Sequence, residues 1–185
     1  MVRVYTIGHS TRALEEFVGL LAREGIRQLA DVRTFPSSRR YPHFNRESLA
    51  VTLPQQGIAY VHLPALGGRR RPRPDSVNVA WRNDGFRGYA DHMATAEFKG
   101  GIDRLIDLAS RANTTVMCAE AVPWRCHRNL ISDALLARGA EVLHIMDAKT
   151  ELHTLTRFAW IEDGEVRYGD PRMAGQQELF GGRRH

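Results

Sequence analysis

The chain has 185 residues, of which 43% are hydrophobic and 25% charged, with a formal net charge of +5. These values are typical of a globular protein and exclude a disordered or fibrous one, and the length suits one domain with a tail. No apolar run approaches the roughly 18 residues that a membrane helix needs, and two cysteines are too few for a disulfide scaffold. The first residues enter a strand pattern directly, so we expect no signal peptide and a cytoplasmic location.

Positive charge is concentrated in the first part of the chain. Residues 1–74 carry a net charge of +7, and residues 75–185 carry −2. This asymmetry favours a polyanionic partner such as nucleic acid for the first part. Arginine accounts for 24 of the 26 basic residues, however, and a GC-rich genome produces the same bias. Charge alone therefore gives nucleic acid only mild support.

Strand and helix patterns alternate along most of the chain. Short apolar or alternating runs predict five strands, at residues 2–7, 26–32, 58–63, 114–118 and 141–145. Apolar residues at helical spacing predict helices between them, at about residues 14–24, 46–55, 86–109 and 125–138. The third helix is expected in two pieces broken near Gly100 and Gly101, and Ser10 or Thr11 is expected to cap the first. The alternation predicts a three-layer α/β fold with a mainly parallel sheet of about five strands.

The pattern weakens after residue 149, so we expect an α/β domain over residues 1–149 and a C-terminal extension over residues 150–185. In the extension, two short strands around Asp163 and Gly164 predict a small hairpin, and residues 169–185 are expected to form a flexible tail. Residues 64–84 lack apolar periodicity and are expected to form a long loop. Four arginines of this loop are expected to contact a nucleic-acid backbone: Arg69, Arg70, Arg71 and Arg73.

Polar groups follow three of the predicted strands. The first strand ends in Gly8, His9 and Ser10, the second in Asp31, Val32 and Arg33, and the fourth in Cys118, Ala119 and Glu120. Ligands of open parallel sheets bind beyond the carboxyl ends of the strands. We therefore expect these groups to share one edge of the sheet with residues 125–128, which open the next helix.

Two of these groups suit an anion. Gly8 permits a close turn, and backbone N–H groups at Ser10 and Thr11 are expected to open a helix that binds phosphate. An ordinary capped turn has the same pattern. Asp31 and Arg33 point to the same side of their strand, either as a substrate clamp or as a salt bridge at the strand end.

Cys126 is expected in the first turn of a helix. The helix N-terminus and the neighbouring Arg125, His127 and Arg128 favour a thiolate, so Cys126 is a candidate nucleophile. A buried cysteine that packs as a small hydrophobic side chain fits the same position.

Glu120 is a candidate general acid or base, with His127 or His9 as its partner. It is equally consistent with a simple ion pair to Arg125 or Arg128. A phosphatase-like or rhodanese-like loop is rejected, because six residues separate Cys118 from Arg125 where the phosphatase signature has five.

A metal site formed by Cys118, Cys126, His127 and His9 has suitable ligand types. Adjacent helical residues diverge by about 100°, however, so Cys126 and His127 do not readily share one ion. The sequence also contains no CxxC or HxxxH spacing among these residues. No metal is predicted, and the sequence indicates no particular cofactor.

The motifs at this edge resemble a known family. Thr6–Ser10, Asp31–Arg33 with Pro36 and Ser37, and Cys118–Glu120 with Cys126–Arg128 are similar to domain of unknown function 488, an uncharacterised bacterial and archaeal family. The resemblance covers about residues 3–147. It implies a Rossmann-like α/β fold and a site at the motif residues, Ser37 included, without supplying a reaction.

The tail contains a short motif of its own. Gln176, Gln177, Glu178, Leu179 and Phe180 are similar to the peptide that binds the bacterial sliding clamp. In such a contact Leu179 and Phe180 enter an apolar pocket while Gln176 makes polar contacts. Gln177 and Glu178 depart from the pattern, and a Leu-Phe tail that folds back on its own domain is the alternative.

These observations lead to one preferred function and two alternatives. We expect a cytoplasmic enzyme that acts on nucleic acid or a phosphate-containing, nucleotide-like compound in DNA maintenance. The expected catalytic residues are Glu120, His127, His9 and Cys126, and the expected substrate-binding residues are Gly8, Ser10, Asp31, Arg33, Ser37, Arg125 and Arg128. The alternatives are a thiol- or metal-dependent redox enzyme that uses Cys118 and Cys126, and a non-catalytic DNA-binding module.

Overall fold

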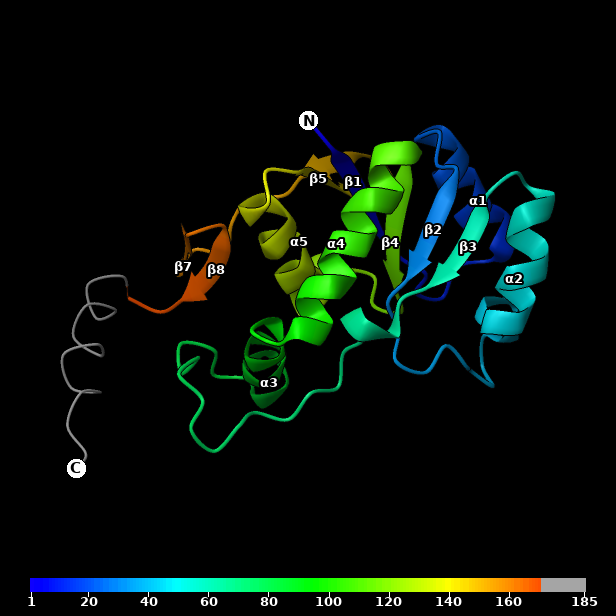
Figure 1. Ribbon diagram of the computed structural model, residues 1–185. Coiled ribbons are helices and arrows are strands. Elements are labelled where there is room, and N and C mark those ends of the chain that lie inside the picture. Colours follow the sequence, from blue (N-terminus) through cyan, green and yellow to red (C-terminus); the bar gives the residue numbers. More distant parts are fainter. Residues whose placement is uncertain (171–185) are drawn as a thin grey trace, which may run out of the picture.

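A six-stranded sheet forms the centre of the molecule (Figure 1). The computed structural model describes residues 1–170, so the predicted clamp peptide at Gln176, Leu179 and Phe180 lies outside the described residues. The order across the sheet is β3 (Ala59–His62), β2 (Gln28–Asp31), β4 (Thr114–Cys118), β1 (Arg3–Gly8), β5 (Glu141–Ile145) and β6 (Thr150–Leu152). The first five strands are parallel, and β6 is antiparallel to β5. The predicted α/β fold with a mainly parallel sheet is confirmed, and residues 150–152 add an edge strand to it.

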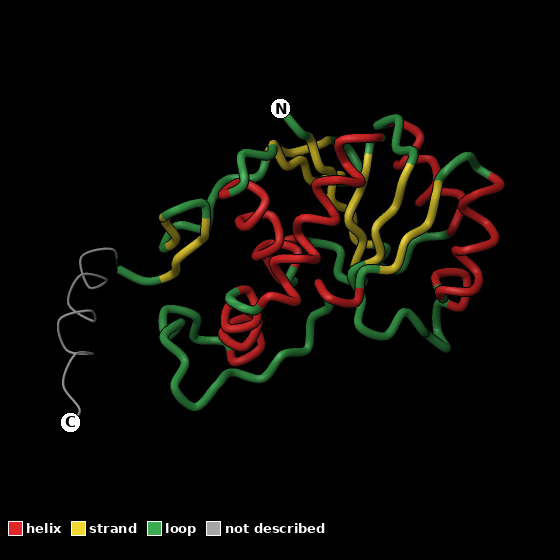
Figure 2. Tube along the Cα trace, viewed as in Figure 1, coloured by secondary structure: helices red, strands yellow, loops and turns green. Residues whose placement is uncertain are grey.

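Helices cover both faces of the sheet, which gives three layers (Figures 1 and 2). On one face, α1 (Leu14–Arg23) and α2 (Arg46–Gln55) bury Phe17, Leu21, Leu49 and Leu53 in one core cluster. The other face carries α3 (Asp84–Met93), α4 (Ala96–Arg111) and α5 (Arg128–Ala137). Their apolar side chains form a second cluster with the sheet. Strand β4 is buried along its whole length, as expected of a central parallel strand.

The cap of the first helix and the position of the break between the next helices differ from the sequence predictions. The first helix begins at Leu14 with Ala13 as its N-cap, so the prediction that Ser10 or Thr11 caps it was wrong. The break between α3 and α4 falls before Ala96, where the Thr95 side chain accepts a hydrogen bond from the Phe98 amide. Gly101 does not break the helix but lies inside α4. Its lack of a side chain leaves room for Leu66, which a Cβ atom at this position would meet.

Short 3₁₀ turns occur at Pro42–Phe44, Pro64–Leu66 and Pro123–Arg125. The last of these replaces the predicted start of the final helix, so that α5 begins only at Arg128. Cys126 therefore lies just before the helix and not in its first turn.

A separate hairpin, β7 (Ala159–Glu162) and β8 (Glu165–Tyr168), follows the sheet. Its two-residue turn, Asp163 and Gly164, has positive φ at both positions, as the expected type I′ turn requires. Among the described residues, no helix combines the length and apolar character needed to cross a membrane.

Candidate functional site

The carboxyl ends of β2, β4 and β1 lie side by side, as the sequence predicted. Gly8 at the end of β1 is opposite Cys118 of β4, and Asp31 at the end of β2 is opposite Met117. The segment after Cys118 then turns back across this edge through the Pro123–Arg125 turn and leads into α5. Three of the predicted motif groups therefore meet at one edge of the sheet.

The backbone after β1 stays bonded to the backbone after β4. The amide of His9 donates to the carbonyl of Cys118 at 2.9 Å, and the amide of Ser10 donates to that of Ala119 at 3.0 Å. The carbonyl of Glu120 approaches Gly8 so closely that a Cβ atom there would lie 1.6 Å from its oxygen. The Ser10 amide thus has a protein partner, and no helix opens at this turn to bind an anion.

Asp31 and Arg33 form a buried ion pair at the end of β2. The Nε and Nη2 groups of Arg33 donate to the two carboxylate oxygens of Asp31 at 2.8 and 2.6 Å. Nη2 also donates to the carbonyl of Phe44 at 2.7 Å, and the hydroxyl of Tyr60 donates to Asp31 at 2.7 Å. Of the two interpretations of this motif, the structure has the salt bridge at the strand end.

His9 is buried against the same ion pair. Its Nδ1 donates to the carbonyl of Ser10 at 2.9 Å, so that Nε2 accepts from Nη1 of Arg33 at 3.3 Å. The ring stacks on Phe44 with centroids 4.5 Å apart. Burial, together with the positive charge of Arg33, lowers the pKa of His9 to about 4. His9 is therefore a neutral, fully bonded side chain at neutral pH.

The two cysteines come together on the other side of Gly8. The Sγ atoms of Cys118 and Cys126 are 2.8 Å apart, both thiols are free, and only 1% and 4% of these residues are exposed. Each sulfur has a further contact on its own segment: the Cys118 sulfur lies 3.8 Å from the carbonyl oxygen of Glu120, and the amide of Arg128 donates to the Cys126 sulfur at 3.4 Å. Cys118 and Cys126, eight residues apart in the sequence, thus form a buried pair of thiols, called the dithiol below.

The surroundings of this dithiol favour one thiolate. The Cys118 thiol is the leading cause that lowers the pKa of Cys126 to about 3, and His127 and Arg128 lower it further against the effect of burial. Burial and the same sulfur–sulfur contact raise the pKa of Cys118. The arrangement is a Cys126 thiolate that accepts a hydrogen bond from the Cys118 thiol.

His127 flanks the sulfur of Cys126. Its Nδ1 lies 3.5 Å from that sulfur, and its Nε2 donates to the carbonyl of Val32 at 3.1 Å. The ring packs against Tyr89 of α3, with centroids 5.2 Å apart, and against Gly68, where any side chain would meet the imidazole. The bond to Val32 and these contacts fix the ring beside the thiol.

Arg128 is the largest fully buried side chain, with 1% exposed. Its Nη2 donates to the carbonyls of Glu120 and Ala121 at 2.7 and 3.3 Å, and its Nη1 donates to the hydroxyl of Thr6 at 3.2 Å. Its Nε is buried without a hydrogen bond, and no carboxylate among the described residues forms an ion pair with it. A buried guanidinium in this state is costly, and its positive charge is one of the causes that lower the pKa of Cys126.

Other predicted site residues do not converge on the dithiol. The side chains of Glu120 and Arg125 are exposed and make no hydrogen bond or ion pair within residues 1–170. Ser37 is exposed on the loop after β2. In the loop after β3, Arg70 pairs with Glu97 at 3.6 Å and Arg73 with Asp75 at 2.8 Å. Arg69 and Arg71 are exposed without such a partner in the described part of the chain.

The described residues contain no group of three or more His, Cys, Asp or Glu side chains placed to hold a metal ion. His9, one of the four ligands considered from the sequence, is bonded to Ser10 and Arg33. The dithiol is left with His127 as its only neighbouring imidazole among those ligands.

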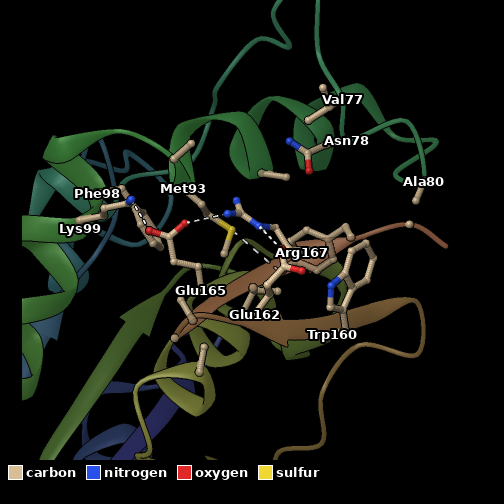
Figure 3. A pocket seen from close by; sticks show the side chains of 18 of the residues that line it. Val77, Asn78, Ala80, Met93, Phe98, Lys99, Trp160, Glu162, Glu165 and Arg167 are labelled. Atoms are coloured by element: carbon tan, nitrogen blue, oxygen red, sulfur yellow. Dashed lines mark hydrogen bonds and ion pairs between the residues drawn. The ribbon is translucent and has the colours of Figure 1, made fainter. Parts of the chain in front are cut away.

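A cavity of about 850 Å³ lies between α3, α4, α5 and the β7–β8 hairpin (Figure 3). Its wall includes Met93, Phe98 and Trp160, and an ion pair between Lys99 and Glu165 crosses its rim. None of the predicted site residues within residues 1–170 lines it.

Sequence reasoning missed His144, His153 and Asp133 and named Thr6 only as part of a family motif. These four residues form a polar chain leading away from Arg128. The available signal was His144 in the middle of the apolar run of residues 141–145. A histidine on a buried strand needs a hydrogen-bond partner, and it therefore marks a buried polar contact.

Comparison with protein-family models matches residues 13–135, more than half of the chain, to Domain of unknown function DUF488. Neither the curated proteins nor the solved structures contain a match. The match confirms the resemblance found in the sequence. The chain belongs to the DUF488 family.

Proposed function

We propose that the protein is a thiol-dependent redox enzyme in which Cys126 is the nucleophile and Cys118 the resolving thiol. The observation that carries the proposal is the 2.8 Å contact between the two sulfurs, next to the buried Arg128, whose amide donates to Cys126 and whose guanidinium has no carboxylate partner among the described residues. Phosphate chemistry at this edge has less support, because the Ser10 amide and the Arg33 side chain are bonded within the protein.

Burial of the dithiol favours a small oxidant, and we assign a hydroperoxide. The thiolate of Cys126 attacks the terminal oxygen, the O–O bond breaks, and the leaving alkoxide takes a proton to become an alcohol. Cys126 is then a sulfenic acid. The sulfur of Cys118 attacks Cys126, the S–O bond breaks, and hydroxide leaves as water with the proton of Cys118. The dithiol loses two electrons and becomes a disulfide, which an external thiol reduces again.

The neighbours of Cys126 have defined parts in this reaction. His127 and Arg128 hold the nucleophile as a thiolate, which is the reactive form of cysteine. The hydrogen bond from Cys118 places the second sulfur in contact with the first before oxidation begins. The exposed Trp124 and Arg125 lie on the turn between the two cysteines.

The test is oxidation of the reduced, full-length protein with hydrogen peroxide, followed by peptide mapping. We expect one intramolecular disulfide between Cys118 and Cys126. In Cys118→Ser the sulfenic acid of Cys126 should persist and react with a dimedone probe, whereas Cys126→Ser should consume no peroxide. Peroxide consumption by Cys126→Ser at the wild-type rate would overturn the proposal, as would two free thiols in the treated wild-type protein.

A second candidate function is backbone binding of nucleic acid by Arg69 and Arg71. The observation in its favour is that these two arginines are exposed without an ion pair among the described residues, whereas Arg70 and Arg73 are paired with acids. The double variant Arg69→Ala/Arg71→Ala should weaken binding to duplex DNA and flatten its salt dependence. The matched double variant at Arg70 and Arg73 should change both less. Equal effects of the two double variants would contradict this assignment.

A further inference from the structure

A continuous hydrogen-bonded chain runs through the interior from Arg128 to Asp133. Nη1 of Arg128 lies 3.2 Å from the hydroxyl of Thr6, which lies 2.7 Å from Nδ1 of His144. Nε2 of His144 lies 3.0 Å from Nδ1 of His153, and Nε2 of His153 lies 2.9 Å from Asp133. All five residues are buried, with at most 6% of any one exposed.

The fold brings these residues together from two strands, one helix and the segment that follows β6. Thr6 of β1 and His144 of β5 are directly opposite each other in the parallel pair. His153 follows β6, where its backbone amide donates to the carbonyl of Val142 at 2.8 Å. Arg128 and Asp133 are both on α5, so the chain leaves this helix at one residue and returns to it at another.

The chemistry of its two ends gives the chain one direction. A guanidinium can only donate hydrogen bonds, and a carboxylate can only accept them. Burial and the charge of Arg128 contribute to lowering the pKa of His144 to about 3, so this ring is uncharged at neutral pH. Thr6 accepts from Arg128 and donates to Nδ1 of His144, whose Nε2–H then donates to His153. Every hydrogen in the chain points from Arg128 towards Asp133.

Asp133, the last member of the hydrogen-bonded chain, is held by residues near the C-terminal end of the described part of the protein. Asp133 accepts hydrogen bonds from the amide and the hydroxyl of Thr156, at 3.0 and 2.7 Å. It also accepts one from the hydroxyl of Tyr168 at 2.9 Å. Tyr168 belongs to β8 and lines the cavity beside the hairpin. The Asp133 carboxylate is therefore fixed independently of Arg128.

We propose that Thr6, His144, His153 and Asp133 are positioning residues that fix the Arg128 guanidinium beside the dithiol. The Glu120 carbonyl that this guanidinium binds also contacts the Cys118 sulfur, and the Arg128 amide donates to the Cys126 sulfur. This inference rests on the proposed redox function. Two backbone carbonyls hold Nη2 of Arg128, but only Thr6 holds Nη1, and a guanidinium with a free Nη1 can rotate about its last bonds. The chain prevents that rotation, because each of its members is itself held by the next.

The titratable or charged groups that face Cys126 are Cys118 of β4, His127 and Arg128 beside it, and Tyr89 of α3. A test of positioning must leave all four in place. Thr6→Val does so, because it removes only the hydroxyl and keeps the β-branched shape of a buried strand residue.

Thr115→Val is the matched control. Thr115 is also fully buried, in the neighbouring strand β4, and its hydroxyl has no hydrogen-bond partner. Both variants therefore remove one buried hydroxyl from the sheet, but only Thr6→Val interrupts the chain. Thr6→Ser restores the hydroxyl and should restore the wild-type behaviour.

The readout is the thiolate absorbance of Cys126 in the reduced, full-length protein, recorded in a stopped-flow instrument directly after a jump to acid pH. We expect the midpoint of this titration to rise by about one pH unit in Thr6→Val, a tenfold weaker preference for the thiolate, and to stay unchanged in Thr115→Val. A role confined to packing would lower the unfolding temperature without moving this midpoint. If Thr6→Val does not fold, His144→Leu interrupts the chain at its next member and carries the same expectation.

Two results would overturn the inference, and they differ in what else they overturn. If the wild-type protein has the thiolate and Thr6→Val titrates with the same midpoint as the wild type, only the positioning role is overturned. A wild-type protein without a thiolate at acid pH would overturn the proposed redox function and this inference with it.

Discussion

Position 8 requires glycine, because only a hydrogen atom fits where another residue has its side chain. A methyl group at this position would overlap the backbone carbonyl of Glu120, at 1.6 Å from the oxygen, and would crowd Arg128 as well. Gly8→Ala should therefore destabilise the protein by at least about 1–3 kcal/mol, the usual cost of overpacking. Gly19→Ala is the control, since its side chain would meet nothing within 4 Å and a helical alanine is favourable by about 1 kcal/mol. Urea denaturation of the two variants measures the difference, and similar stabilities would contradict the close approach.

Cys118 lowers the pKa of Cys126 through the hydrogen bond between the two sulfurs. Its thiol is the leading cause of the low pKa of Cys126. Cys118→Ala should therefore raise the pKa of Cys126, and Cys118→Ser, which keeps a hydrogen-bond donor, should raise it less. The pH dependence of alkylation at Cys126 reports both shifts. Equal profiles in the wild type and both variants would show that the sulfur–sulfur contact does not stabilise the thiolate.

At the scale of elements, the end of β2 is stabilised by the ion pair between Asp31 and Arg33. Asp31 is fully buried, and its carboxylate accepts from Arg33 and Tyr60. Asp31→Asn leaves a buried guanidinium without its counter-charge and should cost about 3–5 kcal/mol of unfolding free energy. Tyr60→Phe removes one neutral donor from the same carboxylate and should cost less, about 1.5–3 kcal/mol. Denaturant titration that ranks the two variants in the opposite order would contradict this account of the strand end.

The elements that the sequence predicted best are those with a strong apolar pattern. Strands β4 and β5 begin and end where the apolar pattern places them. Helix α2 also has its predicted bounds, although its apolar pattern is weak. Boundaries set by a few polar contacts were missed, because the Thr95 cap and the packing of Gly101 on Leu66 depend on atoms that a periodicity does not contain. The start of α5 was missed for a similar reason, since the Pro123–Arg125 turn precedes it.

Over the whole molecule, buried neutral histidines make stability depend on pH. The pKa of His9 falls from its ordinary 6.5 to about 4 on folding, so the unfolded chain binds the proton more tightly. The contribution of His9 is complete above about pH 6.5 and is lost as the pH falls towards 4, at most about 3 kcal/mol. His144 adds to the same loss, because its folded pKa is about 3. Unfolding free energies at pH 7 and pH 5 should therefore differ less in His9→Asn than in the wild type, and an unchanged difference would exclude His9 as a source.

The site was predicted in part. The convergence of Gly8, Asp31 and Cys118 followed from the rule that parallel strands end at one edge, and it is present. The partners of Thr6, His144 and Arg128 were not predictable, because Thr6 and His144 meet only through the β1–β5 register and Arg128 reaches Thr6 from 122 residues away. The local pair with Asp31 neutralises Arg33, whereas Arg128 has no carboxylate partner among the described residues. This difference turns the interpretation from phosphate binding towards thiol chemistry.

The most direct test of the redox proposal is the ultraviolet absorbance of thiolate in the reduced, folded protein between pH 5 and pH 9. One of the two cysteines, Cys126, should be a thiolate over this whole range, because its pKa is lowered to about 3 while that of Cys118 is raised. We therefore predict the absorbance of one thiolate per chain with no step. A sigmoidal rise with a midpoint near 8.5, the value of an ordinary thiol, would contradict the proposed nucleophile.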